Sequence, residues 1–183
     1  ANSDTTSGTV DFVSLTSYSE TAVFAANKIL PSIVGIEITY NVNSSIFSMF
    51  GNNSSSTAKS SGSGIIISED GYILTNNHVV DSESQNTYYD ISEATSIKVT
   101  LSKDNTEYDA KIVGKDSQTD LAVLKIDATG LTAAEFADSD SVKIGEFAMA
   151  VGNPLDLGST ITCGVVSATN RQVQDSDGNT TYT

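Results

Sequence analysis

Short runs in which hydrophobic and polar positions alternate occupy most of the chain, and this pattern predicts strands. Two runs fold back as hairpins: residues 65–74 turn at Glu69-Asp70-Gly71, and residues 97–113 turn at Asp104-Asn105. Further strand patterns cover residues 33–40, 121–126, 147–151 and 160–168. Turn-forming residues separate these short runs, so the sequence predicts an all-β barrel or sandwich.

One segment departs from the strand pattern. Apolar residues recur at helical spacing between Ser19 and Leu30, and Pro31 follows, so we expect one short amphipathic helix that ends there. Residues 1–18 are rich in Ser, Thr and Asp with few apolar positions, and they are predicted to form a mobile arm.

Polar segments interrupt the strands. Residues 41–63 are predicted to form a long surface loop, and residues 81–96 a surface insertion. The first loop contains an apolar insert, which consists of Ile46, Phe47, Met49 and Phe50. These side chains either tuck against their own domain or dock on a partner subunit. The second alternative is considered because long loops often carry a function. Residues 175–179 are better explained as a hairpin turn than as a calcium loop, because their glycine stands at the wrong position.

The charge of the chain argues against two classes of partner. Among 183 residues, 9 are basic and 23 are acidic, and the net charge of −14 repels nucleic acid phosphates and anionic lipid headgroups. No apolar run reaches about 18 residues, so no membrane-spanning segment is expected. Cys163 is the single cysteine, which excludes an internal disulfide framework and a multi-thiolate metal site. We expect Cys163 to be packed as a small hydrophobic side chain.

One histidine and one aspartate carry the candidate chemistry. His78 is the only histidine, and taken alone its setting is more typical of a structural hydrogen-bonding residue. Asp120 directly precedes the apolar strand 121–126, where an unpaired buried carboxylate would cost several kcal/mol. An imidazole N–H is a suitable partner for this carboxylate. An aspartate that orients a histidine forms two thirds of a nucleophilic triad.

At these motifs the sequence resembles the HtrA/Deg family of trypsin-like serine proteases, over residues 19–171. The most specific motifs are Thr75-Asn-Asn-His-Val-Val80 and Thr119-Asp-Leu-Ala-Val-Leu124, in this order. Other matching segments are Leu30-Pro-Ser-Ile-Val-Gly35, Ser61-Gly-Ser-Gly-Ile-Ile66, Val151-Gly-Asn-Pro154 and Thr162-Cys-Gly-Val-Val-Ser-Ala168.

The resemblance implies a trypsin-like double β-barrel. Residues 19–130 would contain the N-terminal helix and the first barrel, and residues 131–183 an incomplete second barrel. By the same resemblance His78 is the general base and Asp120 orients it, with no cofactor and no metal. The family also implies unfolded or misfolded polypeptide substrates, a location outside the cytoplasm, and a homotrimer built through the N-terminal segment. Candidate contacts in the trimer are Phe12, Tyr18 and Phe24.

The sequence departs from the family in one respect. The Gly-Asn-Ser-Gly-Gly motif, which supplies the nucleophile and the oxyanion hole, does not occur in residues 1–183. Ser63 lies between two glycines but precedes His78, against the family order of His, Asp and Ser, so it is not expected to replace the nucleophile. We therefore expect residues 1–183 to be part of a longer protease and inactive alone. The alternatives are a pseudoprotease or peptide-binding module of the same fold, and an extracellular β-module with a coincidental match.

Overall fold

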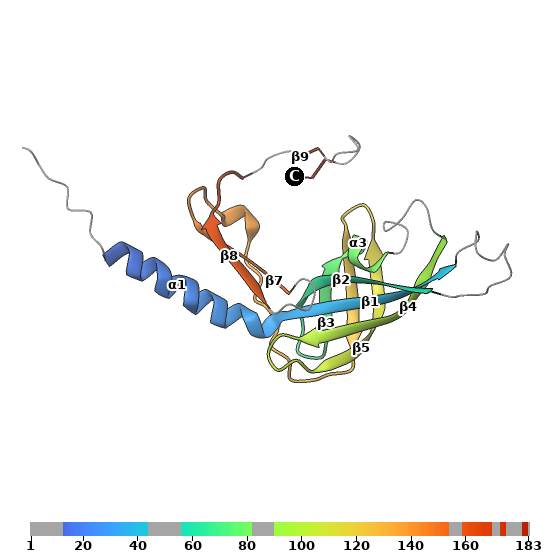
Figure 1. The fold of residues 1–183 in the computed structure, drawn as a ribbon. Helices are drawn as coiled ribbons and strands as arrows, with labels where there is room; N and C mark the ends of the chain where they lie inside the picture. The colour runs from blue at the N-terminus through green and yellow to red at the C-terminus, as the bar shows by residue number, and fades with distance from the viewer. Residues whose placement is uncertain are drawn as a thin grey trace, which may run out of the picture.

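Strands form most of the structure, a computed structural model that describes residues 13–43, 56–81, 90–153, 159–169, 173–174 and 181–182. Six antiparallel strands close into a barrel in the order β1-β2-β3-β6-β5-β4 (Figure 1). They are β1 (Ile33–Asn43), β2 (Ser56–Ile66), β3 (Tyr72–Asn76), β4 (Asp90–Leu101), β5 (Glu107–Asp116) and β6 (Leu121–Ile126). The all-β prediction is confirmed, and both predicted hairpins are present, as β2–β3 and β4–β5.

Alternation of side chains along β1 builds the centre of the barrel. Every second side chain from Val34 to Tyr40 is at most 2% exposed, whereas Glu37 between them faces solvent. The alternating pattern in the sequence therefore corresponds to one face of each strand in the core and the other in water. Other strands complete the core with Ile66, Ile73, Ile97, Val99, Leu101, Ala122, Leu124 and Ile126.

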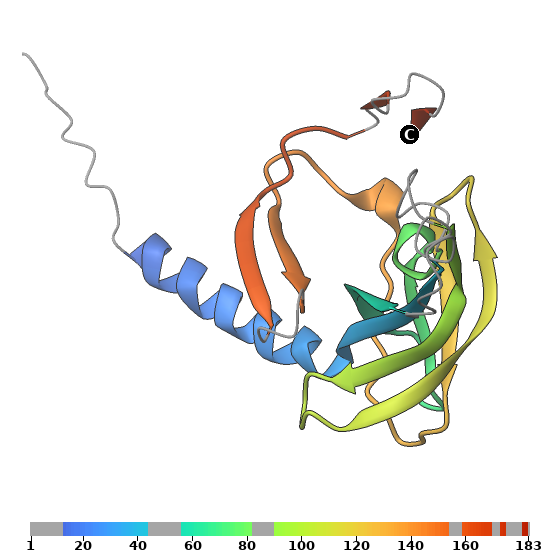
Figure 2. The same ribbon diagram turned by 45° about the vertical axis from the view of Figure 1, so that its right-hand side comes forward.

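The N-terminal helix, α1 (Val13–Ile29), projects away from the barrel (Figures 1 and 2). It begins before Ser19, so the predicted start of the helix was wrong, and residues 13–18 are helical. Within the helix, the hydroxyl of Thr21 donates to the carbonyl of Ser17, one turn earlier (2.8 Å). Pro31 lies in the turn η1 (Leu30–Ser32), which ends the helix as predicted and leads into β1. Residues 1–12 lie outside the described residues.

After β6 the chain follows the barrel and then forms a second, smaller sheet. The N–H groups of Leu131 and Ala134 donate to barrel carbonyls. The chain next forms the turn η3 (Ser139–Ser141) and the hairpin of β7 (Phe147–Gly152) and β8 (Thr160–Val165). The short strands β9 (Val173–Gln174) and β10 (Thr181–Tyr182) pair with each other. The division into two barrels at residue 130 stays a prediction.

The predicted polar loops were partly wrong. β1 continues to Asn43 and β2 begins at Ser56, so only residues 44–55 of the first loop, with its apolar insert, lie outside the described residues. β4 already begins at Asp90, so the predicted insertion was wrong for residues 90–96. Long-range pairing with β1 holds this polar part of β4 in the sheet and overrides its low local strand propensity. The turn at 175–179 also lies outside the described residues.

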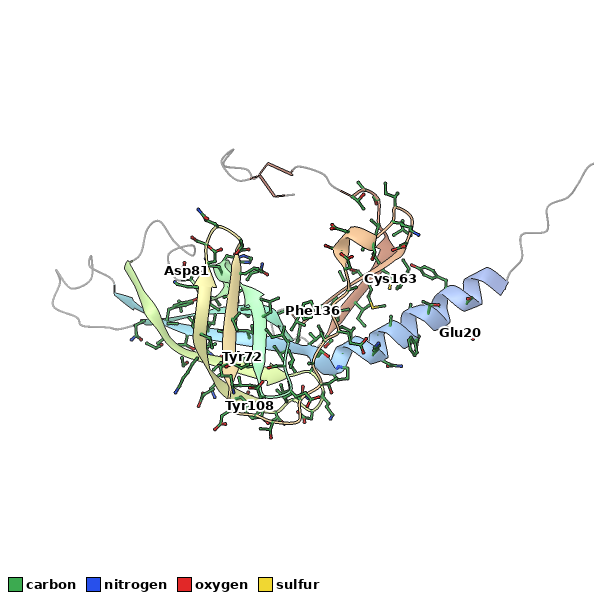
Figure 3. All side chains as sticks on the ribbon, turned by 180° about the vertical axis from the view of Figure 1, so that it is seen from behind. Glu20, Tyr72, Asp81, Tyr108, Phe136 and Cys163 are labelled. Atoms are coloured by element: carbon green, nitrogen blue, oxygen red, sulfur yellow. The ribbon has the colours of Figure 1, made fainter. Side chains whose placement is uncertain are left out.

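The small sheet leaves its outer face open. Cys163 was expected to be packed, but it is exposed on β8 (Figure 3). Among the described residues, β8 pairs with β7 alone, so the other edge of β8 has no strand partner there. On the other strand, the ring of Phe147 contacts Tyr18 of α1 edge to face, with ring centres 5.2 Å apart. In the part of the chain that the structure describes, no helix is both long and apolar enough to cross a membrane.

Candidate active site

The pairing of β3 with β6 brings the two sequence motifs together. Asn76, at the end of β3, is the register partner of Leu121, at the start of β6. Since these strands are antiparallel, the residues after Asn76 meet the residue before Leu121. There the chain turns into the short helix α3 (Asn77–Val80), whose first N–H donates to the backbone carbonyl of Asp120 (3.0 Å). His78 and Asp120 thus meet at one end of the barrel, where α3 lies (Figure 1).

Asp120 turns its carboxylate toward α3. Its φ angle of +54° lies in the left-handed region, which residues other than glycine rarely adopt. The Oδ1 atom accepts the backbone N–H of His78 (2.9 Å), and Oδ2 accepts the Nδ1–H of the His78 ring (2.7 Å). The Nδ2 atom of Asn76 also donates to Oδ2 (3.1 Å). These hydrogen bonds offset the cost of the unfavourable backbone conformation.

The surroundings of Asp120 keep its carboxyl group ionised. Partial burial raises the pKa of Asp120, but the backbone N–H, the ring and the charge of His78, together with the Asn76 amide, lower it below its ordinary value. The ionised carboxylate holds the proton of the His78 ring on Nδ1, which leaves Nε2 as the basic nitrogen. The His78 side chain is 61% exposed, so the ring is within reach of other molecules. The pair can therefore act as an oriented base.

Contacts with the barrel hold α3 in place. The buried hydroxyl of Tyr40 donates to the carbonyl of Val79 (3.3 Å). The Val79 side chain packs against Gly62 of β2 so closely that a Cβ atom on Gly62 would lie 2.6 Å from it. Just before α3, the Oγ1 of Thr75 donates to the carbonyl of Ser63 (2.8 Å). Asp81, directly after α3, lies at the opposite end of the barrel from Tyr72 (Figure 3).

Ser63 has a structural position in the barrel. Its hydroxyl oxygen accepts the backbone N–H of Asn153 (2.8 Å), at the end of β7. Its carbonyl accepts the hydroxyl of Thr75. Ser63 therefore joins β2 to β3 and to the second sheet, which agrees with the expectation that it is not the nucleophile.

From the sequence, Asn76 is a positioning residue at most, with no chemistry assigned to it, and Tyr40 is not singled out. Asn76 stands two positions before His78, and the β3–β6 register is the signal that could have placed it beside Asp120. Tyr40 is 39 residues from the carbonyl that it contacts, so no local signal identifies it. Within the described ranges, no group of three or more His, Cys, Asp and Glu side chains could hold a metal ion.

Comparisons with known proteins show which family the chain belongs to. The family described as trypsin-like peptidase domain matches residues 62–183. The chain is 47% identical over 116 residues to the probable periplasmic serine endoprotease DegP-like of Rhizobium meliloti (strain 1021), and this alignment covers 63% of the chain. The chain is also 48% identical over 112 residues to the periplasmic serine endoprotease DegP of Escherichia coli (strain K12), and this alignment covers 60% of the chain.

Solved structures extend the likeness to the fold. The HtrA-type protease AlgW with decapeptide superimposes with a TM-score of 0.66 at 32% identity, over 88% of this chain and 49% of AlgW. A variant of AlgW with decapeptide gives a TM-score of 0.69 at 36% identity, over 88% of this chain and 48% of the variant. The chain spans about a fifth of the length of the curated relatives that it matches. The expected resemblance and the trypsin-like fold are confirmed. The periplasmic location in the relatives' names supports a location outside the cytoplasm.

Proposed function

Because this chain belongs to the family of trypsin-like peptidase domains, we propose that it is the base-bearing part of an HtrA-type serine endopeptidase. The observation that carries the proposal is the contact of 2.7 Å between His78 Nδ1 and Asp120 Oδ2. This contact joins the two most specific motifs of the sequence in the arrangement that nucleophilic hydrolysis of a peptide bond requires.

His78 is the general base of the reaction. Its Nε2 atom takes the proton from a serine hydroxyl while the serine oxygen attacks the carbonyl carbon of the substrate. The protonated ring then gives this proton to the leaving amine, and an acyl-enzyme remains. Water hydrolyses the acyl-enzyme with His78 as base again. Asp120 stays ionised throughout and stabilises the imidazolium, for which its lowered pKa is suited.

The nucleophile comes from outside residues 1–183. In the family the serine follows the aspartate, in a Gly-Asn-Ser-Gly-Gly segment, and the same segment supplies the oxyanion-hole N–H groups. Ser63 is not the replacement, because it precedes His78 and its oxygen accepts the N–H of Asn153. Residues 1–183 alone are therefore inactive.

Activity of the full-length protein on fluorescent casein tests this function. We expect cleavage by the full-length chain and by Asn27→Ala, an exposed substitution on α1. Asp120→Asn should lower kcat about 10⁴-fold, and His78→Ala should lower it at least as much. Residues 1–183 alone should not cleave casein or react with a serine-directed phosphonate probe. A full-length chain that binds peptides without cleaving them would make the protein a pseudoprotease, and cleavage by His78→Ala would overturn the assigned base.

The substrates and the assembly are part of the same proposal. Unfolded polypeptides are the substrates, and the protein forms a homotrimer through α1. Phe24 is 70% exposed, and it lines a groove of about 410 Å³ with Phe136, which is 70% exposed as well. Tyr18 already contacts Phe147 in its own chain, and Phe12 lies outside the described residues. Phe24 is therefore the more exposed of the two described candidates, since Tyr18 is 44% exposed.

Light scattering of the full-length protein tests the trimer. We expect three times the mass of one chain, because exposed aromatic side chains favour an interface. Phe24→Ser should reduce the mass toward that of a single chain. Val113→Ser, which changes another exposed apolar residue on β5, is the matched control and should leave the trimer intact. A monomeric full-length protein would contradict this assembly without affecting the assignment of His78.

A further inference from the structure

We propose that Asn76 is a positioning residue, whose side-chain amide fixes the carboxylate of Asp120 against the ring of His78. The catalytic consequence of this inference rests on the proposed function. The geometry itself does not, because all three side chains lie within residues 1–183.

The amide of Asn76 makes two contacts with the same residue. Its Nδ2 atom lies 3.1 Å from the backbone carbonyl oxygen of Asp120 and 3.1 Å from Oδ2 of its side chain. Oδ2 is also the atom that accepts the Nδ1–H of His78. Asn76 thus binds the carboxylate at the oxygen that orients the histidine, and it ties this oxygen to the main chain of the same turn.

The usual role of an asparagine at this position does not explain these contacts. Asn76 is the N-cap residue of α3, and asparagine is favoured there because its side-chain oxygen can accept an N–H of the first turn. The Asn76 side chain makes no such capping hydrogen bond. Its NH₂ group is directed to Asp120 instead, where a donor stabilises an ionised carboxylate.

Asn76 also holds the backbone of Asp120 in its unfavourable conformation. The φ angle of +54° costs free energy unless surrounding contacts maintain it. The carbonyl of Asp120 receives the Nδ2–H of Asn76 and the backbone N–H of Asn77. Loss of the Asn76 amide would therefore remove one donor to the carboxylate and one of the two donors to this carbonyl.

The charged groups of the neighbouring elements are engaged elsewhere. Asp81, after α3, pairs with Lys115 of β5 (3.5 Å). Asp116 accepts the hydroxyl of Thr119 (2.8 Å) and the N–H of Gln118 (3.0 Å). His78 is the titratable group whose charge acts on Asp120 among the described residues, and its effect lowers the pKa of Asp120 in the same direction as the amide of Asn76.

Nuclear magnetic resonance on residues 1–183 tests the inference without any activity. His78 is the only histidine, so the ring ¹⁵N signals in a labelled sample report on this site alone. The ¹³Cγ shift of Asp120, assigned by its loss in Asp120→Asn, gives the pKa of the carboxyl group. The variants are Asn76→Ala, which removes the donor, and Asn76→Asp, which keeps the size and shape but replaces the donor with a carboxylate. Asn27→Ala on α1 is the matched control.

The pKa of Asp120 in Asn76→Ala separates positioning from packing. We expect the pKa of Asp120 to rise from wild type to Asn76→Ala and to rise further in Asn76→Asp, because the second change places a like charge beside the carboxylate. A residue that only fills space would leave the pKa of Asp120 unchanged in Asn76→Ala, because no donor to the carboxylate would be lost, and that result would overturn the inference. The like charge in Asn76→Asp raises this pKa whatever the role of the amide, so this variant reports only that position 76 lies beside the carboxylate.

Kinetics of the full-length protein add a second readout. Asn76→Ala should lower kcat about tenfold with little change in KM, because the substrate still binds while the base is less well oriented. If the full-length protein proves inactive, the proposed function fails, while the titration of Asp120 still decides the role of Asn76. A normal kcat in Asn76→Ala would show that Asn76 does not position the pair.

Discussion

The hydroxyl of Ser63 accepts a hydrogen bond from the backbone N–H of Asn153, 90 residues further along the chain. Ser63 lies in β2 of the barrel, whereas Asn153 follows the last residue of β7 in the small sheet. Asn153 is 5% exposed, so its N–H has little access to water. One side chain therefore connects the strand beside the His78 motif to the second sheet.

Replacing Ser63 by Ala should remove the hydrogen bond that connects the two sheets. The buried N–H of Asn153 would lose its acceptor, and we expect a loss of about 1–3 kcal/mol in the free energy of unfolding. Denaturant unfolding measures this loss, and faster hydrogen exchange at Asn153 localises it. Ser61→Ala, an exposed position in β2, is the control and should change stability little. In the full-length protein Ser63→Ala should still cleave casein, and an inactive Ser63→Ala that is folded would make Ser63 a candidate nucleophile after all.

Tyr40 supports α3 from inside the barrel, and Tyr40→Phe isolates its hydroxyl group. The carbonyl of Val79 would lose its donor, and we expect a loss of about 1 kcal/mol in the free energy of unfolding. Tyr72→Phe, at a more exposed ring, should cost less. Because α3 carries His78, the ¹⁵N signals of the His78 ring should also shift in Tyr40→Phe and not in Tyr72→Phe. Equal stability of wild type and Tyr40→Phe would contradict this role.

The same hydroxyl gives a pH dependence at the alkaline end. Burial, and to a smaller extent the charge of Asp81, raise the pKa of Tyr40 above its ordinary value. A group whose pKa is raised on folding favours the folded state while it is protonated. Its contribution is therefore present below about pH 10, the pKa in the unfolded chain, and is lost as the pH rises through the folded-state pKa. The difference in the free energy of unfolding between wild type and Tyr40→Phe, measured by denaturant unfolding, should therefore shrink as the pH rises above about 10.

The strand pattern could be predicted from the sequence because its signal is local. The His78–Asp120 pair, 42 residues apart, could be predicted only through two motifs and the family resemblance that they carry. Alternation along β1 and the apolar run after Asp120 are visible in a few consecutive residues. Tyr40, Asn76 and the Ser63–Asn153 contact could not be predicted, since each depends on a register or on a fold-back that consecutive residues do not encode. The polar start of β4 was missed for the same reason, because its pairing with β1 decides its structure.

The predicted turn at Gly71 offers a graded test of backbone strain. Gly71 has a φ angle of +102°, and a Cβ atom there would lie 2.5 Å from the carbonyl oxygen of Ile126. We expect Gly71→Ala to lower the free energy of unfolding by more than about 2 kcal/mol. Gly130→Ala shares the positive φ (+69°) but meets no neighbouring atoms within 4 Å, so it should cost only about 1 kcal/mol. Gly114→Ala, with neither feature, should be nearly neutral, and a different order among the three would contradict this account.

Asp120 should contribute to stability above acidic pH and not below it. Its pKa is lower in the folded protein than in the unfolded chain, so the ionised carboxylate favours folding. The contribution is fully present above the unfolded pKa of about 3.9 and is lost as the pH falls through the lower folded-state pKa. We therefore expect Asp120→Asn to be less stable than wild type at pH 7, with the difference shrinking below about pH 4. Denaturant unfolding of both proteins from pH 7 to strongly acidic pH measures this difference, in which the other carboxyl groups cancel. A difference that stays constant to the lowest pH would show that Asp120 stabilises the turn by its shape and not by its charge.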